Sequence, residues 1–190
     1  RNSMFYMWIL NWCNSYMNIP TFIETYKVSE SLCDDLIKYY ENNKEYTKLR
    51  KDIPNTNDSL FYNDSQDPTI QKFFKTLGDA ITKYAKKYKI FGGLRTYVVN
   101  KIQHYQPGFG YSALHYERGR KEVQDRQVVY MLYLNTVKDE GGTIFPHQKV
   151  ITKAIKGDLI LWPADFTHPH AGIISKTEQK YIATGWFVMT

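Results

Sequence analysis

The pattern of apolar and polar positions divides the chain into a helical first half and a β-rich second half. After Ser29, a residue type typical of helix N-caps, apolar side chains recur every three or four positions as far as Asn42. A second helix is predicted to begin at Pro68. Its apolar face comprises Ile70, Phe73, Phe74, Leu77, Ile81 and Tyr84. We therefore predict two amphipathic helices, preceded by a short strand over residues 21–26.

From residue 94 onward, runs of β-branched and aromatic residues alternate with turn signals such as Pro107-Gly108 and Gly141-Gly142. The predicted strands are 96–99, 128–134, 155–162 and 181–188. Helices followed by regularly spaced strands predict an α+β fold, an antiparallel sandwich or barrel with helices on one side. The polar stretch 48–66 is predicted to be a long loop, and loops of that length are often functional. No repeat or linker divides the chain, so we expect one domain over residues 1–190.

Composition narrows the possible partners. The 190 residues carry a net charge of +6, but the basic residues are scattered, which favours a solvated surface over a nucleic-acid groove. Cys13 and Cys33 are too few for a disulfide framework or a zinc site. Buried thiols in a reducing compartment are expected, and a single disulfide stays open. The apolar run 5–10 is too short to span a membrane. We expect residues 5–10 to form a strand or a packing arm, although the remainder of a trimmed leader is an open alternative. We expect the protein to be soluble and cytoplasmic.

Histidines and one carboxylate in the β-rich half could bind a metal. His115 and Glu117 are two residues apart, so their side chains share a face if the segment is a strand. His168 and His170 have the same spacing, and either could complete a set of two imidazoles and one carboxylate. Such a facial set is typical of non-haem Fe(II) oxygenases. Single histidines on surface strands are the more ordinary alternative, and we expect that role for His104 and His147, the other histidines of the chain.

The order and spacing of these segments resemble the Fe(II)/2-oxoglutarate-dependent dioxygenases of the prolyl 4-hydroxylase type, including short viral, phage and algal forms. The similar segments are the His-x-acid pair, MLYLN followed by EGGTIFP, KGDLILWPA, and a histidine ten residues before KYIATGW. The helix SESLCDDLI resembles the family's entry helix. The resemblance implies a double-stranded β-helix (jelly-roll, cupin-like) core over about 94–190, with helices of a support region, about 1–93, packed on one face. Most prolyl hydroxylases carry Asp where this chain has Glu117.

The resemblance also implies roles for individual residues. The proposed Fe(II) ligands are His115, Glu117 and His170. Lys180 would bind the far carboxylate of 2-oxoglutarate, and its position ten residues after His170 selects that histidine over His168. His168 would then line the approach or face solvent. Further cosubstrate contacts would be Tyr105, Tyr133 and Thr184, and substrate contacts Tyr111 and Trp186. Core packing is the competing role for the tyrosines and for Trp186, since the chain has 16 tyrosines.

The function that follows is hydroxylation of an aliphatic C–H, with proline in a peptide or protein as the expected substrate. The implied cofactors are Fe(II) and 2-oxoglutarate, with O2 as cosubstrate and ascorbate as a candidate addition. Three other substrate classes remain open: a free amino acid, another protein side chain and an alkylated nucleobase. Lys180 and the scattered charge favour a peptide, because nucleobase demethylases of this superfamily generally use Arg and a basic groove. A non-catalytic, metal-binding jelly-roll module is the alternative outside enzymes.

Overall fold

The computed structural model describes residues 20–49, 58–62, 66–96 and 100–190. The apolar run 5–10 and Cys13 lie outside these ranges. The helices are α2 (Glu30–Asn42) and α3 (Pro68–Tyr88), with short 3-10 helices at Lys44–Tyr46 and Lys121–Val123. The strands are β1 (Glu24–Lys27), β2 (Lys48–Leu49), β3 (Asp58–Tyr62), β4 (Leu94–Thr96), β5 (Asn100–Tyr105), β6 (Arg126–Tyr133), β7 (Thr143–Phe145), β8 (Val150–Ile151), β9 (Asp158–Pro163), β10 (Ala171–Gly172) and β11 (Lys180–Met189).

Both helices begin where the sequence predicted. The Ser29 side chain accepts a hydrogen bond from the backbone N–H of Leu32 at the start of α2. Asp67 caps α3, and Pro68 occupies the first helical turn, where a missing N–H has no effect on the helix. Each helix buries the apolar stripe that its periodicity predicted, which confirms the helical part of the sequence analysis.

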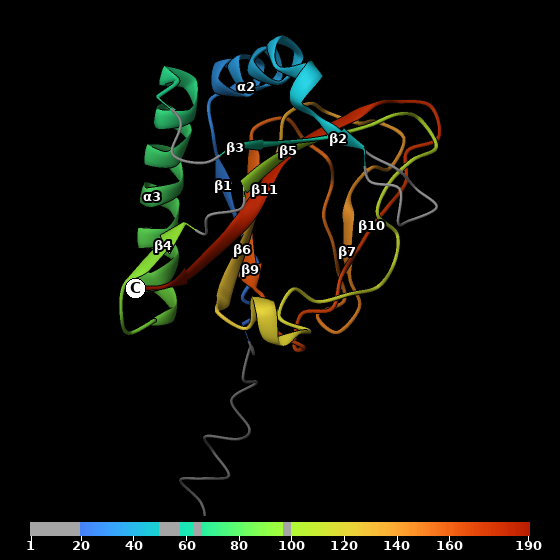
Figure 1. The fold of residues 1–190 in the computed structure, drawn as a ribbon. Helices are drawn as coiled ribbons and strands as arrows, with labels where there is room; N and C mark the ends of the chain where they lie inside the picture. The colour runs from blue at the N-terminus through green and yellow to red at the C-terminus, as the bar shows by residue number, and fades with distance from the viewer. Residues whose placement is uncertain (1–19, 50–57, 63–65, 97–99) are drawn as a thin grey trace, which may run out of the picture.

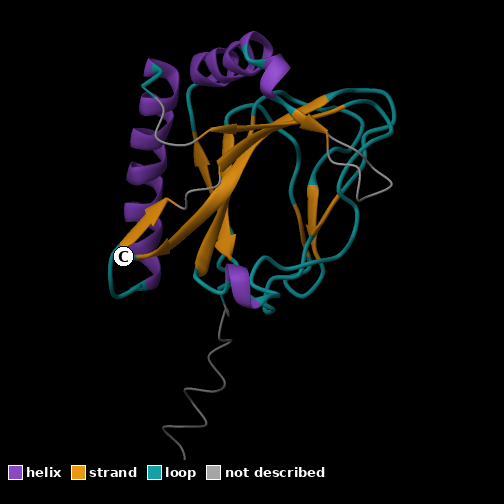
Figure 2. Ribbon diagram, viewed as in Figure 1, coloured by secondary structure: helices purple, strands orange, loops and turns teal. Residues whose placement is uncertain are grey.

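The strands form two antiparallel sheets (Figures 1 and 2). The larger sheet has the order β1-β9-β6-β11-β5-β3-β2, and β4 pairs with the far end of β11. The smaller sheet has the order β10-β7-β8. Figure 1 shows α2 and α3 on one side of the larger sheet and the smaller sheet on the other. The structure therefore confirms the predicted α+β class with helices on one face.

Alternation along the central strands creates two apolar layers. On β11, Tyr181, Ala183 and Phe187 pack with the helices. Ile182 and Trp186 belong instead to the second cluster, on the opposite face of the sheet. The same alternation on β6 sends Tyr130 to the helix side and Val129 to the other. Every second residue of the central strands therefore faces the space between the two sheets.

The predicted loop 48–66 was wrong in part. Residues Asp58–Tyr62 form β3, which pairs with β5, while residues 50–57 and 63–65 lie outside the described ranges. The buried side chains of Leu60 and Tyr62 alternate with exposed Phe61, a strand pattern that the polar neighbourhood obscured. The first third of the chain thus contributes strands as well as helices to the larger sheet.

Two further expectations concern the cysteines and the membrane. Cys33 is a free, buried thiol, and burial raises its pKa to about 11. Within the described residues, neither helix is long and apolar enough to cross a membrane.

Candidate functional site

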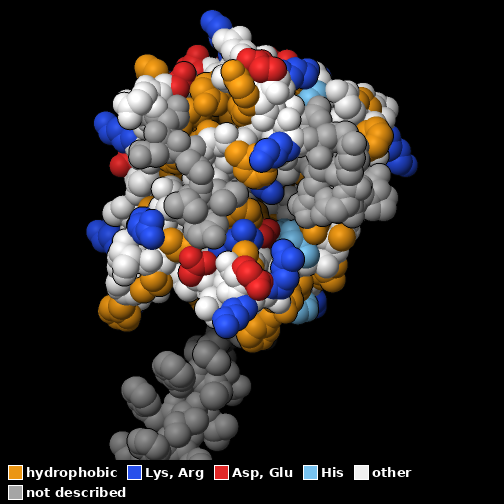
Figure 3. Space-filling view, viewed as in Figure 1, with side chains coloured by type: hydrophobic (Ala, Val, Ile, Leu, Met, Phe, Trp, Pro, Cys, Tyr) orange, Lys and Arg blue, Asp and Glu red, His pale blue; other side chains and the backbone are white. Residues whose placement is uncertain are grey.

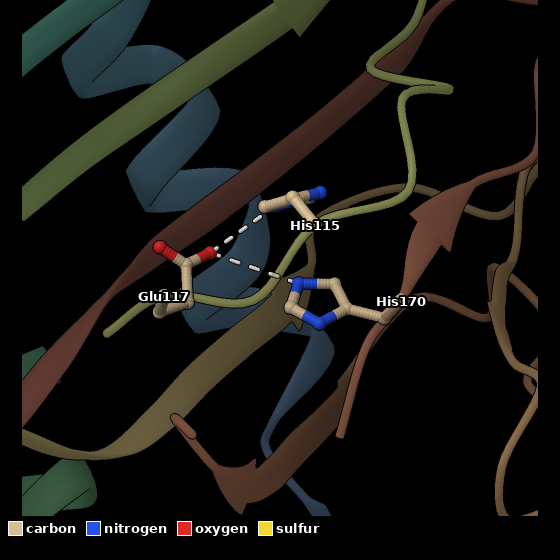
Figure 4. Close-up of side chains that lie close together, drawn as sticks. All are labelled: His115, Glu117 and His170. Carbon is tan, nitrogen blue, oxygen red and sulfur yellow. Dashed lines mark ion pairs between the residues drawn. The ribbon is translucent and has the colours of Figure 1, made fainter. Parts of the chain in front are cut away.

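The three predicted metal-binding residues converge between the sheets (Figure 4). His115 and His170 form an isolated antiparallel bridge through backbone hydrogen bonds of 3.1 and 2.8 Å. The backbone N–H of Glu117 donates to the carbonyl of Ala164 at 2.9 Å. These contacts bring the side-chain donor atoms of the triad within 4.8 Å of one another. The pair at 115 and 117 therefore shares a direction because of one bridge and a following turn, and not because of a regular strand.

Hydrogen bonds fix which imidazole nitrogens face the centre of the triad. Nδ1 of His115 lies 2.8 Å from the carbonyl oxygen of Ala113, and Nδ1 of His170 lies 3.0 Å from that of His168. A carbonyl oxygen only accepts, so each Nδ1 carries a proton, and the tautomer that this selects for a neutral ring has its lone pair on Nε2. This is the arrangement by which metal-binding histidines are usually oriented. Both Nε2 atoms are therefore prepared to bind a cation.

Glu117 supplies the third donor. Its Oε1 lies 3.4 Å from Nε2 of His115 and 3.6 Å from Nε2 of His170. Burial opposes the charge of this carboxyl, but hydrogen bonds and positive charge from the two imidazoles, in their protonated form, outweigh burial and hold its pKa well below the usual range. The carboxylate is therefore ionised at neutral pH. Three lone pairs meeting at these distances fit a divalent cation between them, since two nitrogens and one oxygen form the facial set of a non-haem iron site.

Aromatic residues pack around the triad. Tyr111 contacts the ring of His115 edge-on at 4.4 Å between centroids. Trp162 and Phe145 contact the ring of His170 at 5.0 and 5.6 Å. The imidazoles are therefore held in place by packing as well as by their Nδ1 hydrogen bonds.

A cavity of about 710 Å³ opens next to the triad. All of the predicted site residues except Tyr133 line it: His115, Glu117, His170, Lys180, Tyr105, Thr184, Tyr111 and Trp186. Figure 3 views a face on which histidine and charged side chains surround a hollow. Alternation explains much of this set, because Lys180, Thr184 and Trp186 are separated by even numbers of residues on β11.

Lys180 is a buried cation in the wall of the cavity. Its side chain donates hydrogen bonds to the carbonyls of Gly141 (3.0 Å) and Ile173 (3.5 Å), and the residue is only 6% exposed. None of the ion pairs found among the described residues involves it. Burial lowers the pKa of Lys180 to about 8. An anionic ligand placed here would stabilise this ammonium group, because a buried charge without a counter-charge is costly.

Hydroxyl groups near Lys180 differ from the predicted set. Tyr105 lies opposite Lys180 across the β5–β11 pairing, with its ring centroid 5.3 Å from Nζ. Tyr133 is fully buried, and its hydroxyl bonds with those of Thr143 and Thr152, each at 3.0 Å. Tyr133 is therefore not among the residues that line the cavity, whereas Thr143, to which its hydroxyl bonds, is one of them.

The residues beside Glu117 were not predicted from the sequence. Arg126 donates to Oε2 of Glu117 at 3.2 Å. Its guanidinium carbon also lies 3.5 Å from the centroid of the Trp186 ring. Trp186, predicted as a substrate contact or a core residue, is 5% exposed and supports Arg126 while lining the cavity. Thr184 donates its hydroxyl proton to the carbonyl of Tyr130 at 2.9 Å.

Two expectations about histidines were wrong. His168 neither lines the cavity nor faces solvent: it is 3% exposed, and its Nε2 donates to the carbonyl of Thr21 at 2.8 Å. It precedes the bridge at His170 within a turn, so strand alternation does not apply to the pair. His104 is buried and stacks on Tyr181 at 4.1 Å, because its neighbours on β5 place it on the helix side of the sheet. His147 is exposed, as predicted, but it lies in a turn and not on a strand.

Known structures share this fold. A viral collagen prolyl hydroxylase from Paramecium bursaria Chlorella virus-1, in complex with 2-oxoglutarate, superposes with a TM-score of 0.71 at 19% identity, over 89% of this chain and 96% of that one. A Pseudomonas putida prolyl-4-hydroxylase gives 0.71 at 18% identity, over 88% and 91%. A Trichoplax adhaerens prolyl hydroxylase, in complex with a hypoxia-inducible-factor peptide, gives 0.67 at 15% identity, over 98% and 90%. These similarities confirm the double-stranded β-helix fold.

Sequence comparison adds the family. No curated protein sequence shows significant similarity to this chain. A family model described as the 2OG-Fe(II) oxygenase superfamily matches residues 100–188, a segment that contains every candidate site residue. The family and the His-Glu-His triad together imply Fe(II) and 2-oxoglutarate as cofactors. This segment of the chain belongs to the 2OG-Fe(II) oxygenase superfamily.

Proposed function

We propose that this oxygenase hydroxylates an aliphatic C–H bond, and that its substrate is proline in a peptide or protein. The observation that carries the proposal is one cavity that holds both a convergent His-Glu-His triad and a buried lysine. The first feature suits a divalent metal, and the second suits a ligand with a carboxylate at its far end. Together they match the two cofactors that the superfamily implies.

In this proposal His115, Glu117 and His170 hold Fe(II). The Nδ1 hydrogen bonds to Ala113 and His168 orient the two imidazoles before the metal arrives. These three residues would supply a facial set of ligands, which would leave positions on the metal for 2-oxoglutarate and O2. Glu in place of Asp still provides the carboxylate oxygen, on a side chain one methylene longer.

Lys180 binds the far carboxylate of 2-oxoglutarate in this proposal. A charge-assisted hydrogen bond inside a cavity is stronger than one in water, because water no longer competes for the ammonium group. Tyr105 and Thr143 line the same wall and offer hydroxyl groups to the same carboxylate. Thr184 commits its proton to a backbone carbonyl, so it can act only as an acceptor there.

When bound, Fe(II) and 2-oxoglutarate supply the oxidising chemistry, in which O2 and 2-oxoglutarate yield succinate, CO2 and a hydroxylated C–H. The protein's own residues bind, orient and shield the reactants. The rings of Tyr111, Trp162 and Phe145 pack on the histidines and keep water from their edges. Lys180 and the triad, at separate points of the cavity wall, fix both ends of the cosubstrate.

Three observations favour a peptide as the substrate. Tyr116, which lines the cavity, is 43% exposed, and Leu114 is 61% exposed, so His115 has an exposed apolar side chain on either side of it in the sequence. Three structures of similar fold are prolyl hydroxylases, one of them in complex with a peptide. Lysine as the carboxylate-binding residue also resembles prolyl hydroxylases more than nucleobase demethylases.

A peptide-library assay tests this function. Proline-containing peptides are incubated with the protein, Fe(II), 2-oxoglutarate and ascorbate, and mass spectrometry follows the addition of one oxygen atom. The proposal predicts 4-hydroxyproline in peptides treated with the parent protein and none with His170→Ala. Oxidation of free amino acids, other side chains or alkylated bases, with no hydroxyproline, would reassign the substrate. The absence of all turnover despite metal binding would favour a non-catalytic module.

A further inference from the structure

The two carboxylate oxygens of Glu117 have different neighbours. Oε1 faces both histidines, at 3.4 Å from Nε2 of His115 and 3.6 Å from Nε2 of His170. Oε2 lies 3.2 Å from a guanidinium nitrogen of Arg126. In Figure 4, one oxygen of Glu117 is joined to both histidines and the other points away from them. The carboxylate is thus divided between the metal-facing side and Arg126.

Arg126 is itself held in a defined position. Its guanidinium carbon lies 3.5 Å from the centroid of Trp186, and the same nitrogen lies 3.4 Å from the backbone carbonyl of Glu117. Arg126 begins β6 and pairs with Val188 beyond an irregularity in the β6–β11 register. Only 14% of its side chain is exposed. A planar guanidinium group stacked in this way has little freedom to rotate, so it can fix the orientation of its partner.

We propose that Arg126 is a positioning residue that fixes the rotation of the Glu117 carboxylate, so that Oε1 alone is presented to the metal. The inference rests on the proposed Fe(II) site. Glutamate has one more side-chain torsion than aspartate, and its carboxylate can rotate to offer one oxygen or both. The hydrogen bond from Arg126 to Oε2 removes that freedom and keeps the second oxygen from the coordination shell.

Electrostatics alone would give the opposite effect, which makes the inference testable. A guanidinium cation near a divalent metal repels it, so removal of the positive charge should strengthen metal binding if charge were the only factor. If Arg126 positions Glu117, its removal should weaken metal binding instead. The sign of the change separates the two explanations.

Co(II) alone is the probe, added to the metal-free protein and its Arg126→Gln variant. Dissociation constants come from titration, and the visible ligand-field spectrum reports the coordination number. Arg126→Gln is expected to bind Co(II) about 10- to 100-fold more weakly, the usual effect of losing such a supporting partner. Its spectrum should shift as both oxygens of Glu117 gain access to the metal. Arg126→Lys keeps the positive charge but lacks the planar guanidinium group. Its Co(II) affinity should lie between those of the parent and Arg126→Gln.

Arg118→Gln is the matched control. Arg118 follows Glu117 directly and carries the same charge as Arg126, but among the described residues no side-chain hydrogen bond or ion pair of Glu117 involves it. This variant should bind Co(II) as tightly as the parent or slightly more tightly. A double variant, Glu117→Asp with Arg126→Gln, adds a second check. The two substitutions should be non-additive, since they act on one contact.

The outcomes separate this inference from the function on which it rests. A parent protein that does not bind Co(II) would overturn the proposed metal site itself. A parent that binds Co(II), with Arg126→Gln equal to it in affinity and spectrum, would overturn the positioning role alone. If Arg126→Gln does not fold, as judged by circular dichroism, Arg126→Lys decides: parent-like binding and spectrum contradict the inference, and weaker binding supports it.

Discussion

Lys180→Met removes the ammonium group of a lysine that the fold buries in the wall of the cavity. Methionine keeps an unbranched chain of similar length but lacks both the charge and the hydrogen bonds to Gly141 and Ile173. If Lys180 exists to bind a carboxylate, its burial costs stability in the absence of that ligand. The variant should therefore change stability and cosubstrate affinity in different directions at neutral pH.

The stability effect follows from the pKa of Lys180. Burial lowers it from 10.5 to about 8, and at about 1.36 kcal/mol per pKa unit this corresponds to a cost of about 3 kcal/mol for the charged form. Methionine avoids this cost, but the loss of the two hydrogen bonds of Lys180 offsets the gain in stability by about 1 kcal/mol for each bond. Lys180→Met should therefore be about 1 kcal/mol more stable than the parent at pH 7.

The pH dependence has a definite sign. Between about pH 8 and 10.5 the unfolded chain binds a proton at Lys180 that the folded chain has lost, so the stability of the parent rises with pH in this window. The difference in free energy of unfolding that favours Lys180→Met at pH 7 should therefore shrink and reverse as the pH rises. Near pH 9.5 the variant should be about 1 kcal/mol less stable than the parent. Urea unfolding of metal-free parent and variant at several pH values measures this difference. Lys176→Met, at an exposed position, is the control and should follow the parent.

The affinity effect follows from the proposed contact. Truncating one partner of a buried, hydrogen-bonded charge pair costs about 2–5 kcal/mol. The dissociation constant for 2-oxoglutarate, measured by calorimetry with a non-oxidisable metal, should rise about 100-fold. Unchanged 2-oxoglutarate binding by Lys180→Met would refute the assignment of Lys180. A stability difference that does not vary with pH would refute the reasoning from its burial.

Three further predictions concern the neighbours of the site. His168→Ala should keep the Co(II) affinity of the parent, but its lost hydrogen bonds should lower the free energy of unfolding by about 1–3 kcal/mol. His170→Ala should lose Co(II) binding. The reverse pattern of Co(II) binding would overturn the choice of His170 as the ligand. Gly185→Ala should lower the free energy of unfolding by about 1–3 kcal/mol, because the new methyl group would lie 2.5 Å from the hydroxyl oxygen of Tyr130. A urea unfolding midpoint equal to that of the parent would contradict this packing. Tyr133→Phe removes two hydroxyl contacts and should lower the free energy of unfolding by about 1–3 kcal/mol. It should weaken 2-oxoglutarate binding far less than Lys180→Met does. An equal loss of affinity in calorimetry would indicate direct contact between Tyr133 and 2-oxoglutarate.

Strand periodicity made much of the cavity predictable. Lys180, Thr184 and Trp186 reach the same side of β11 because even spacing keeps side chains on one face of a sheet. The alternation of β5 likewise turns Tyr105 toward the cavity and His104 toward the helices. The second of these directions was missed because the sequence does not show which face of a two-sided strand is covered.

Other features depend on contacts between distant segments. His168 lies in a turn, where strand alternation fails, and its environment is set by Thr21, 147 positions earlier in the chain. Arg126 and Thr143 reach the site through pairing and packing between segments that are distant in the sequence. The one local signal for Thr143 was Gly141-Gly142 directly before it. A side chain at Gly142 would meet the carbonyl oxygen of Thr152 at 1.9 Å, so glycine allows the close approach of the neighbouring strand.

The central claim is that His115, Glu117 and His170 form an iron centre that uses 2-oxoglutarate. The most direct test is Fe(II)-dependent conversion of 2-oxoglutarate to succinate, followed by NMR for the parent and the His170→Ala and His168→Ala variants. We predict succinate from the parent and from His168→Ala, and none from His170→Ala or from samples without iron. Undiminished succinate formation by His170→Ala, or none by the parent with its iron bound, would contradict the claim.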